Sequence, residues 1–232
     1  MFPVAILAGG LATRLRPITR TVPKALVDVA GKPFIVRQLD YLREQGITHV
    51  VLCVGYLGEM IRDVVGCGHR YGLSVSYSED GTTLLGTGGA LTKATPLLGD
   101  EFFVLYGDSF LPVDFSYVKE VYQSSRQPAL MTVMKNNNQW DSSNVLFIDG
   151  QLREYNKKSP RPEMTYIDYG LGVISGSLFK QRPVGEPFDL SDLYRDLSLR
   201  GQLAGLEMHQ RFYEIGSYAG LKETEEYFLS KE

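Results

Sequence analysis

Cysteine, histidine and tryptophan are scarce in this chain, whose 232 residues include two Cys, three His and one Trp. Cys53 lies within an apolar run and Cys67 lies between glycines, a spacing typical of neither a zinc site nor a redox pair. We therefore expect both to be free thiols in a reducing, cytoplasmic compartment. The histidines stand far apart along the chain, which predicts surface or capping roles for His49, His69 and His209.

Long apolar runs and an excess of positive charge are also missing. No apolar stretch approaches the roughly 18 residues of a membrane span, and the N-terminus lacks the pattern of a signal peptide. The formal net charge of −3 provides no global field for nucleic acid, so any affinity for phosphate must be local. The length suits a single domain over residues 1–232, and we expect a cytoplasmic enzyme or binding protein with neither a membrane nor a nucleic acid as partner.

Short apolar runs alternate with amphipathic helical patterns through the first half of the chain. Predicted strands are 3–8, 48–55, 73–78 and 102–106, and predicted helices are 33–45, 57–65, 88–94 and 114–125. Such alternation predicts a single-domain, Rossmann-like α/β fold with a mixed, mostly parallel sheet flanked by helices.

The second half of the chain is richer in strands. Asp149-Gly150 separates two apolar runs and predicts a β-hairpin. Further strands are predicted at 129–135, 165–175, 202–208 and 212–215, and helices around 190–197 and after Ser217.

The most informative stretch is the opening run, in which an apolar strand leads into Gly9-Gly10 and then Arg14. Backbone N–H groups beside fixed positive charge suit a polyphosphate. The spacing differs from the familiar phosphate loops, because no third glycine stands at the dinucleotide-binding offset and no Gly-Lys-Ser/Thr ending follows. With Pro23-Lys24 downstream, the run resembles the N-terminal motif of the sugar-1-phosphate nucleotidyltransferases, also called NDP-sugar pyrophosphorylases.

This resemblance implies the nucleotide-diphospho-sugar transferase fold, with residues 1–125 mainly binding nucleotide and 126–232 mainly binding sugar phosphate. Its substrates would be a nucleoside triphosphate and a sugar 1-phosphate. Arg14 and Lys24 match the catalytic Arg and Lys of the motif. A planar guanidinium suits the β and γ phosphates, and a lysine can act as a point charge over the α-phosphate. The alternative for each is a solvated surface charge.

Nucleotide binding is expected at two glycine-containing runs, residues 7–10 and residues 79–90. Glycines let backbone groups approach a planar base closely. Glu79 can accept hydrogen bonds from the two adjacent N–H donors of guanine, whereas uracil offers one N–H and stays possible. The alternative for the second run is a helix start that merely packs against the sheet. The predicted nucleotide-binding residues are Leu7, Ala8, Gly9, Gly10, Thr13, Glu79, Gly86, Thr87 and Gly88.

Two carboxylates are predicted to hold Mg²⁺, which needs hard oxygen ligands and keeps several waters. Asp108 follows an apolar run, at the carboxyl end of a predicted interior strand, where open α/β sheets bind their ligands. The resemblance implies that this Asp holds the metal; the alternative is a turn or capping Asp. Glu214 stands where the family has an Asp, and its side chain is one methylene longer. If Glu214 is only a surface residue, the metal would rest on Asp108, phosphates and water.

The sugar phosphate is expected to contact the second half of the chain. Lys157 matches a family Lys, while Asn156 replaces the preceding Glu, so the pattern of hydroxyls that it reads would differ. Without the resemblance, a Lys-Lys pair after a strand would be read as a solvated turn. The predicted sugar-phosphate residues are Asn144, Asn156, Lys157, Asp168, Tyr169 and Gly170.

Within the family, the runs 86–89 and 213–217 look most like those of D-glycero-D-manno-heptose 1-phosphate guanylyltransferases of surface polysaccharide and capsule synthesis. We therefore expect GTP and this heptose phosphate as substrates, and GDP-heptose and pyrophosphate as products. One alternative is a uridylyltransferase for N-acetylmuramate 1-phosphate or a hexose 1-phosphate. Another is a non-catalytic regulator that binds nucleotide sugars. A metal-dependent glycosyltransferase is disfavoured, since Asp108 is not part of an Asp-x-Asp pair. The sequence is silent on oligomeric state, and a homodimer is the assembly to test.

Overall fold

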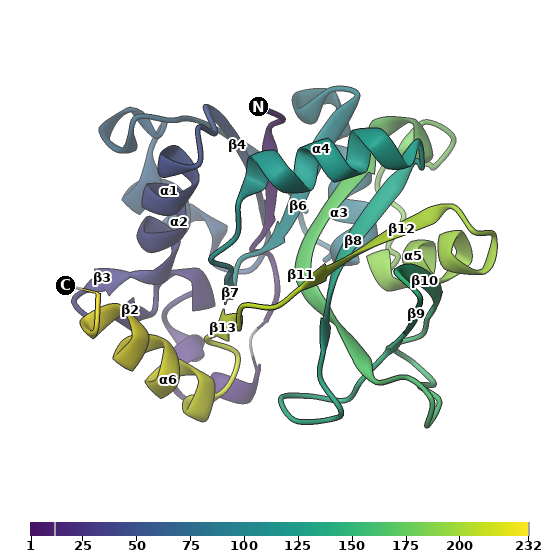
Figure 1. Cartoon of the computed structure of the whole chain (residues 1–232). Coiled ribbons are helices and arrows are strands. Elements are labelled where there is room, and N and C mark those ends of the chain that lie inside the picture. Colours follow the sequence, from purple (N-terminus) through teal and green to yellow (C-terminus); the bar gives the residue numbers. More distant parts are fainter. Residues whose placement is uncertain (12, 232) are drawn as a thin grey trace.

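The computed structural model describes residues 1–11 and 13–231, and in this part of the chain nine strands form one central sheet (Figure 1). Ala12 of the opening motif lies outside the described residues. The strands follow the order β12-β8-β11-β6-β1-β4-β5, and the β9–β10 hairpin is attached beside the start of β11. Their bounds are β1 Val4–Leu7, β4 His49–Val54, β5 Ser74–Glu79, β6 Glu101–Tyr106, β8 Ala129–Lys135, β9 Val145–Ile148, β10 Gln151–Tyr155, β11 Tyr166–Ser175 and β12 Leu203–Met208.

The sheet is mixed and mostly parallel, as predicted. β5, β4, β1 and β6 run parallel to one another, and β12 runs parallel to β8. β11 is antiparallel to both of its long neighbours, β6 and β8, and so joins the two parallel groups into one sheet. The carboxyl ends of β1, β4 and β6 therefore meet at one edge, where the glycine pair of the opening motif follows β1.

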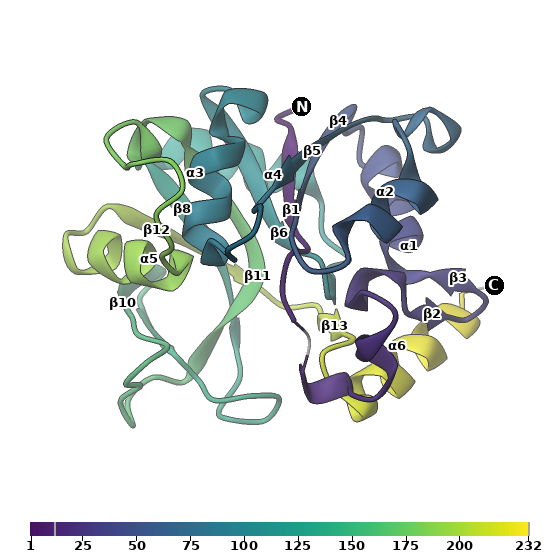
Figure 2. The ribbon, with the colours of Figure 1, turned by 180° about the vertical axis from the view of Figure 1, so that it is seen from behind.

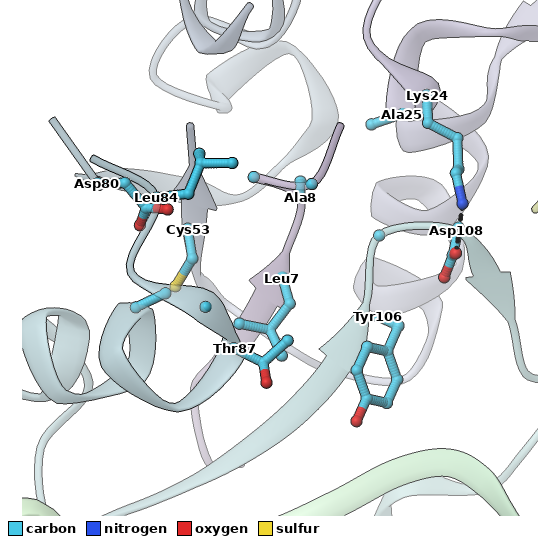
Figure 3. Close-up of a pocket in the computed structure, with 15 residues that line it drawn as sticks. Leu7, Ala8, Lys24, Ala25, Cys53, Asp80, Leu84, Thr87, Tyr106 and Asp108 are labelled. Carbon is cyan, nitrogen blue, oxygen red and sulfur yellow. Dashed lines mark hydrogen bonds and ion pairs between the residues drawn. The ribbon is translucent and has the colours of Figure 1, made fainter. Parts of the chain in front are cut away.

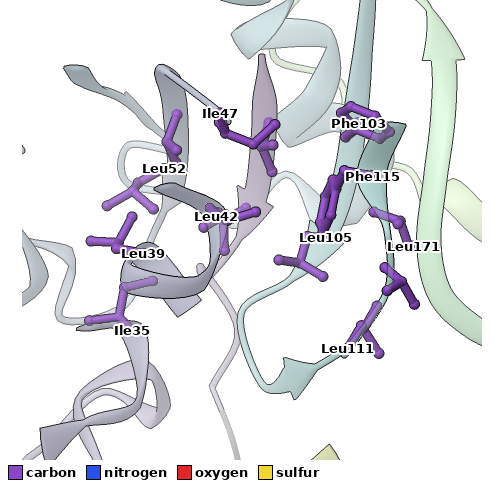
Figure 4. Packing of buried hydrophobic residues seen from close by; sticks show 14 of the residues in the cluster. Ile35, Leu39, Leu42, Ile47, Leu52, Phe103, Leu105, Leu111, Phe115 and Leu171 are labelled. Carbon is purple, nitrogen blue, oxygen red and sulfur yellow. The ribbon is translucent and has the colours of Figure 1, made fainter. Parts of the chain in front are cut away.

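Helices cover both faces of the sheet (Figures 1 and 2). α1 (Phe34–Glu44), α2 (Gly58–Val65) and α4 (Phe115–Ser125) pack on one face, and α3 (Gly86–Leu98) and α5 (Leu190–Leu199) on the other. Alternation along each strand explains this division, because successive side chains point to opposite faces. In β1, for example, Ile6 joins the cluster with Leu39 of α1, whereas Ala5 joins the cluster with Leu91 of α3. Figure 4 shows part of the first cluster, including Leu39.

The predicted helix boundaries follow local signals. Pro33 precedes α1, and the side chain of Asp114 caps α4 by accepting hydrogen bonds from the backbone N–H groups of Ser116 and Tyr117. α3 is longer than predicted at both ends, because its core-facing side continues to Leu98. Within the described residues, no helix combines the length and apolarity needed to cross a bilayer.

Three short strands were not predicted from the sequence, whereas a strand within 212–215 and the helix after Ser217 were predicted and are found. β2 (Asp28–Val29) pairs with β3 (Lys32–Pro33), and β7 (Ser109–Phe110) pairs with β13 (Tyr213–Glu214). With α6 (Tyr218–Leu229) they enclose a third, smaller apolar cluster. The C-terminal motif is thereby brought against the residues that directly follow Asp108.

Candidate active site

A cavity of about 260 Å³ opens at the carboxyl ends of β1, β4 and β6 (Figure 3). The opening motif contributes Leu7, Ala8, Gly9 and Gly10 to its wall. Its lining residues are Leu7, Ala8, Gly9, Gly10, Lys24, Ala25, Cys53, Asp80, Leu84, Gly86, Thr87, Ala90, Tyr106, Gly107 and Asp108. Of the predicted nucleotide residues, Thr13, Glu79 and Gly88 do not line it.

One end of this cavity is marked by an ion pair. Lys24 begins a short 3₁₀ turn after Pro23, and its Nζ lies 2.7 Å from Oδ2 of Asp108 (Figure 3). Asp108 stands in the turn after β6, and the two side chains remain 31% and 18% exposed for Asp108 and Lys24. The cation and the carboxylate therefore face the same cleft and are accessible to a phosphate or a metal ion.

The other end of the cavity contains a carboxylate that the sequence reasoning missed. Asp80 lies there with Leu84 and Cys53, away from Lys24 (Figure 3). Its Oδ2 accepts a hydrogen bond from the backbone N–H of Leu85 at 3.1 Å, and burial raises the pKa of this carboxyl. Glu79, the predicted residue, is exposed and forms an ion pair with Arg62 outside the cavity.

The glycine run at the start of α3 has a packing role that the sequence left as the alternative. Gly86 has a φ of +69°, and a Cβ on it would lie 2.6 Å from the carbonyl oxygen of Phe188. A Cβ on Gly88 would lie 2.5 Å from Cδ2 of the Phe188 ring. The backbone N–H groups of Gly88 and Gly89 donate to the Phe188 carbonyl, at 3.0 and 3.3 Å. These N–H groups are thus already bonded, while Gly86 and Thr87 remain in the cavity wall.

A second cavity, of about 590 Å³, adjoins the first on the side of the strand-rich half. Tyr106 and Asp108 line both cavities, so Asp108 stands at their junction. Among the predicted residues, the second cavity is lined by Arg14, Asp108, Asn144, Lys157, Asp168, Tyr169, Gly170 and Glu214.

Asn156 is the predicted sugar residue that does not line this cavity. Its Oδ1 accepts a hydrogen bond from the backbone N–H of Ser159 at 3.0 Å, and its Nδ2 is 3.4 Å from Oε1 of Glu154. The side chain therefore stabilises the turn after β10. Thr13, which begins a 3₁₀ turn, is exposed and lines neither cavity.

Asp168 is held within the second cavity by one hydrogen bond to its carboxylate and one from its backbone N–H. Oδ1 accepts from the backbone N–H of Gly170 at 3.0 Å, and the Asp168 N–H donates to Oδ1 of Asn144 at 3.0 Å. Burial raises the pKa of the Asp168 carboxyl to about 6, and the Gly170 hydrogen bond and the charge of Lys157 oppose this rise. A partly exposed carboxylate of this kind can accept hydrogen bonds from sugar hydroxyls.

The side chains of Arg14, Lys24 and Glu214 converge around Gly216. A Cβ on Gly216 would lie 2.6 Å from Oε2 of Glu214, 3.3 Å from Nη2 of Arg14 and 3.4 Å from Nζ of Lys24. The Glu214 carboxylate accepts hydrogen bonds from the Gly216 N–H and from Oγ of Ser217. The two predicted catalytic cations thus lie near each other, beside the C-terminal motif.

The oxygen atoms of Asp108 and Glu214 show whether the two predicted metal ligands suit Mg²⁺. Asp108 is accessible at the junction of the cavities, and each Glu214 oxygen keeps a lone pair beyond the hydrogen bond that it accepts. Mg²⁺ needs only one or two carboxylates when phosphates and water complete its shell, so these residues fit the ion. Within the described part of the chain, no three Asp, Glu, His or Cys side chains form a metal-binding group.

One wall of the second cavity was not predicted. The guanidinium of Arg211 lies 3.8 Å from the ring centroid of Trp140 and forms an ion pair with Glu223. All three residues line the cavity. The single Trp of the chain was the one signal in the sequence that could have drawn attention to this wall.

Comparisons with known proteins identify the family of this chain. Residues 4–143 match the nucleotidyl transferase family model. The chain is 30% identical over 227 residues to N-acetylmuramate alpha-1-phosphate uridylyltransferase of Neisseria meningitidis serogroup B, covering 95% of each chain. It is 28% identical over 213 residues to D-glycero-alpha-D-manno-heptose 1-phosphate guanylyltransferase of Campylobacter jejuni, covering 91% of this chain and 93% of the relative.

A solved structure resembles the whole fold. HddC from Yersinia pseudotuberculosis complexed with GMP-PN has a TM-score of 0.79 and 26% identity, over 98% of this chain and 100% of that chain. The family match covers both the opening motif and Asp108. This chain belongs to the nucleotidyl transferase family and is a nucleotidyltransferase of sugar 1-phosphates.

Proposed function

We propose that this chain transfers a guanylyl group from GTP to D-glycero-D-manno-heptose 1-phosphate, giving GDP-heptose and pyrophosphate for surface polysaccharide synthesis. The observation that carries the choice of GTP is Asp80, whose carboxylate lies at the end of the first cavity opposite Lys24. With phosphates at the Lys24 end, the base lies at the Asp80 end. A carboxylate there can accept both the N1–H and N2–H of guanine. The heptose guanylyltransferase relative and the HddC complex with GMP-PN support the same choice.

The reaction needs charge neutralisation and alignment rather than a covalent intermediate. An oxygen of the sugar phosphate attacks the α-phosphorus of GTP, and the bond from that phosphorus to the pyrophosphate leaving group breaks. The junction of the two cavities is the place for this attack, because nucleotide and sugar phosphate meet there. Lys24 neutralises the α-phosphate and Arg14 holds the departing pyrophosphate.

The second half of the site orients the acceptor. Lys157 pairs with the phosphate of the sugar phosphate, and Asp168, Asn144, Tyr169 and Gly170 surround its sugar. Asp108 and Glu214 would hold Mg²⁺, which supplies further positive charge to the phosphates when bound. This division gives residues 1–125 mainly to the nucleotide and 126–232 mainly to the sugar phosphate.

Pyrophosphate release, measured for each of the four triphosphates against a panel of sugar 1-phosphates, tests the proposal. We expect turnover with GTP and the heptose phosphate. Asp80→Asn presents an amide that can donate as well as accept, so it should reduce kcat/KM for GTP by about tenfold. Glu79→Gln, one residue earlier and outside the cavity, is the matched control and should leave kcat/KM unchanged. Turnover with UTP and none with GTP would refute the guanylyl assignment.

A second candidate is a uridylyltransferase for N-acetylmuramate 1-phosphate. The 30% identity to the Neisseria enzyme over 95% of both chains favours it. Asp80 can accept the single N3–H of uracil, so the same cavity accommodates either base. N-acetylmuramate 1-phosphate and UTP therefore belong in the same panel, and the pair with the highest kcat/KM identifies the function.

A further inference from the structure

A buried amide on α1 lies behind the turn that contains Asp108. The polar side chain of Gln38 is only 2% exposed, and its neighbours on the helix, Ile35, Leu39 and Leu42, belong to the apolar core. Buried polar side chains are tolerated where they are hydrogen-bonded. The partners of this amide therefore indicate why a glutamine is accommodated in the core.

Both hydrogens of the Gln38 amide are used on one short segment. Nε2 donates to the carbonyl oxygen of Tyr106 at 2.9 Å and to that of Ser109 at 2.7 Å. These two carbonyls flank Gly107 and Asp108. Within the described residues, Oε1 of Gln38 has no hydrogen-bond partner, so its hydrogen bonds with protein are those that hold this turn.

Other contacts fix the same turn from different directions. The Gly107 N–H donates to the Leu7 carbonyl at 3.0 Å, and the Ile215 N–H donates to the Asp108 carbonyl at 2.9 Å. A Cβ on Gly107 would lie 3.0 Å from the Leu7 carbonyl oxygen, so the turn lies tightly against β1. Gln38 restrains the turn on the side of α1 and does so at both of its ends.

We propose that Gln38 is a positioning residue for Asp108. By holding the Tyr106 and Ser109 carbonyls with a single NH₂ group, it fixes the direction in which the Asp108 carboxylate leaves the backbone. An amide suits this task because it supplies two donors without the charge of a buried lysine or arginine. The inference depends on the proposed role of Asp108 at the junction of the two cavities.

Gln38→Met keeps the approximate length of the side chain and removes both donors. We expect kcat for pyrophosphate release to fall at least tenfold at a temperature well below the melting transition. Gln45→Met is the matched control: Gln45 ends the same helix and bonds the Phe115 N–H at 3.3 Å, away from the site. The control should retain kcat within twofold of the original protein.

A second measurement does not depend on turnover. Calorimetry gives the Kd of GTP and of UTP without sugar phosphate, with and without Mg²⁺. Gln38→Met should reduce the gain in affinity that Mg²⁺ provides while leaving the metal-free Kd within twofold, and Gln45→Met should change neither. In an Asp108→Asn background, Gln38→Met should add no further loss of kcat, since the positioned group is already absent.

Two outcomes would overturn the proposal. One is a folded Gln38→Met protein whose kcat and magnesium effect match those of Gln45→Met. If Gln38→Met fails to fold, Gln38→Asn replaces it, because Asn retains an amide but withdraws it by one methylene. The other overturning outcome is loss of folding in both variants, which would assign Gln38 to stability alone. If the original protein turns over no substrate pair, the proposed function fails, and the magnesium-dependent binding still decides the role of Gln38.

Discussion

Replacing Asp168 with Asn is expected to make the protein more stable and at the same time a poorer enzyme. Asn has the same shape, and its Oδ1 can still accept the hydrogen bond from Gly170. It lacks the charge that burial disfavours. The expectation follows from the direction of the Asp168 pKa, which burial raises from 3.8 to about 6.

The sign and size of the effect can be worked out from that pKa. Between pH 3.8 and 6 the folded protein binds the Asp168 proton more tightly than the unfolded chain, so stability falls as the pH rises through this window. The full difference corresponds to about 3 kcal/mol. Because the side chain is partly exposed, we reduce this figure by half for solvent screening and expect a gain of about 1–2 kcal/mol at pH 8. A melting temperature higher by a few degrees should accompany it.

Urea denaturation of the two proteins at pH 8 and pH 4.5 measures this gain. It should be present in full at pH 8 and fall to about a third of that at pH 4.5, where Asp168 is protonated in the folded protein but mostly ionised in the unfolded chain. Asp149→Asn, in the exposed hairpin turn, is the control and should show no such pH dependence. In the same variant the KM for the sugar phosphate should rise at pH 8. A variant that is less stable at pH 8, or equally stabilised at both pH values, would refute the reasoning.

Three further substitutions test other parts of the site. Lys24→Ala should lower kcat, measured by pyrophosphate release, by about 100-fold or more. It should change the Kd of the triphosphate, measured by calorimetry, less than tenfold. Equal losses in kcat and in affinity would favour a non-catalytic binding protein. Gly216→Ala should lower kcat by about tenfold in the same assay, because its methyl group would displace the Glu214 carboxylate and crowd the Arg14 guanidinium. An unchanged kcat would contradict this. Gly88→Ala should reduce the free energy of unfolding by about 1–3 kcal/mol through overlap with Phe188, yet leave the triphosphate Kd within twofold, as urea titration and calorimetry will show.

The sheet and its helices could be predicted because their signals are local. The strand predicted at 129–135 is found with the same bounds, and the hairpin around Asp149-Gly150 forms as its turn residues indicate. Asp114 and Pro33 mark helix starts by their own chemistry. By contrast, β2, β3 and β7, which were not predicted, have two residues each, too few to produce a periodic pattern.

The details of the site depend on contacts between segments that are far apart in sequence. Nothing near Gly88 indicates that the Phe188 carbonyl will bond the N–H groups at the start of α3. Glu79 and Asp80 both follow an apolar run, and the end of β5 decides which of the two faces the cavity. Asn156 is drawn into a turn by a backbone N–H three residues later. In each case the family resemblance led to a segment beside one of the two cavities, and backbone geometry then decided which residue of that segment lines the cavity.

The pairing of β7 with β13 has a consequence for synthesis on the ribosome, where the chain emerges from its N-terminus. The glycine pair, Lys24 and Asp108, which line the first cavity, are made in the first half. Glu214, Gly216 and α6, which complete the surroundings of Arg14 and the Asp108 turn, come near the end of the described residues. A nascent chain therefore carries residues of the first cavity well before the segment that completes the surroundings of Arg14 and the Asp108 turn, so the complete site forms only late in synthesis.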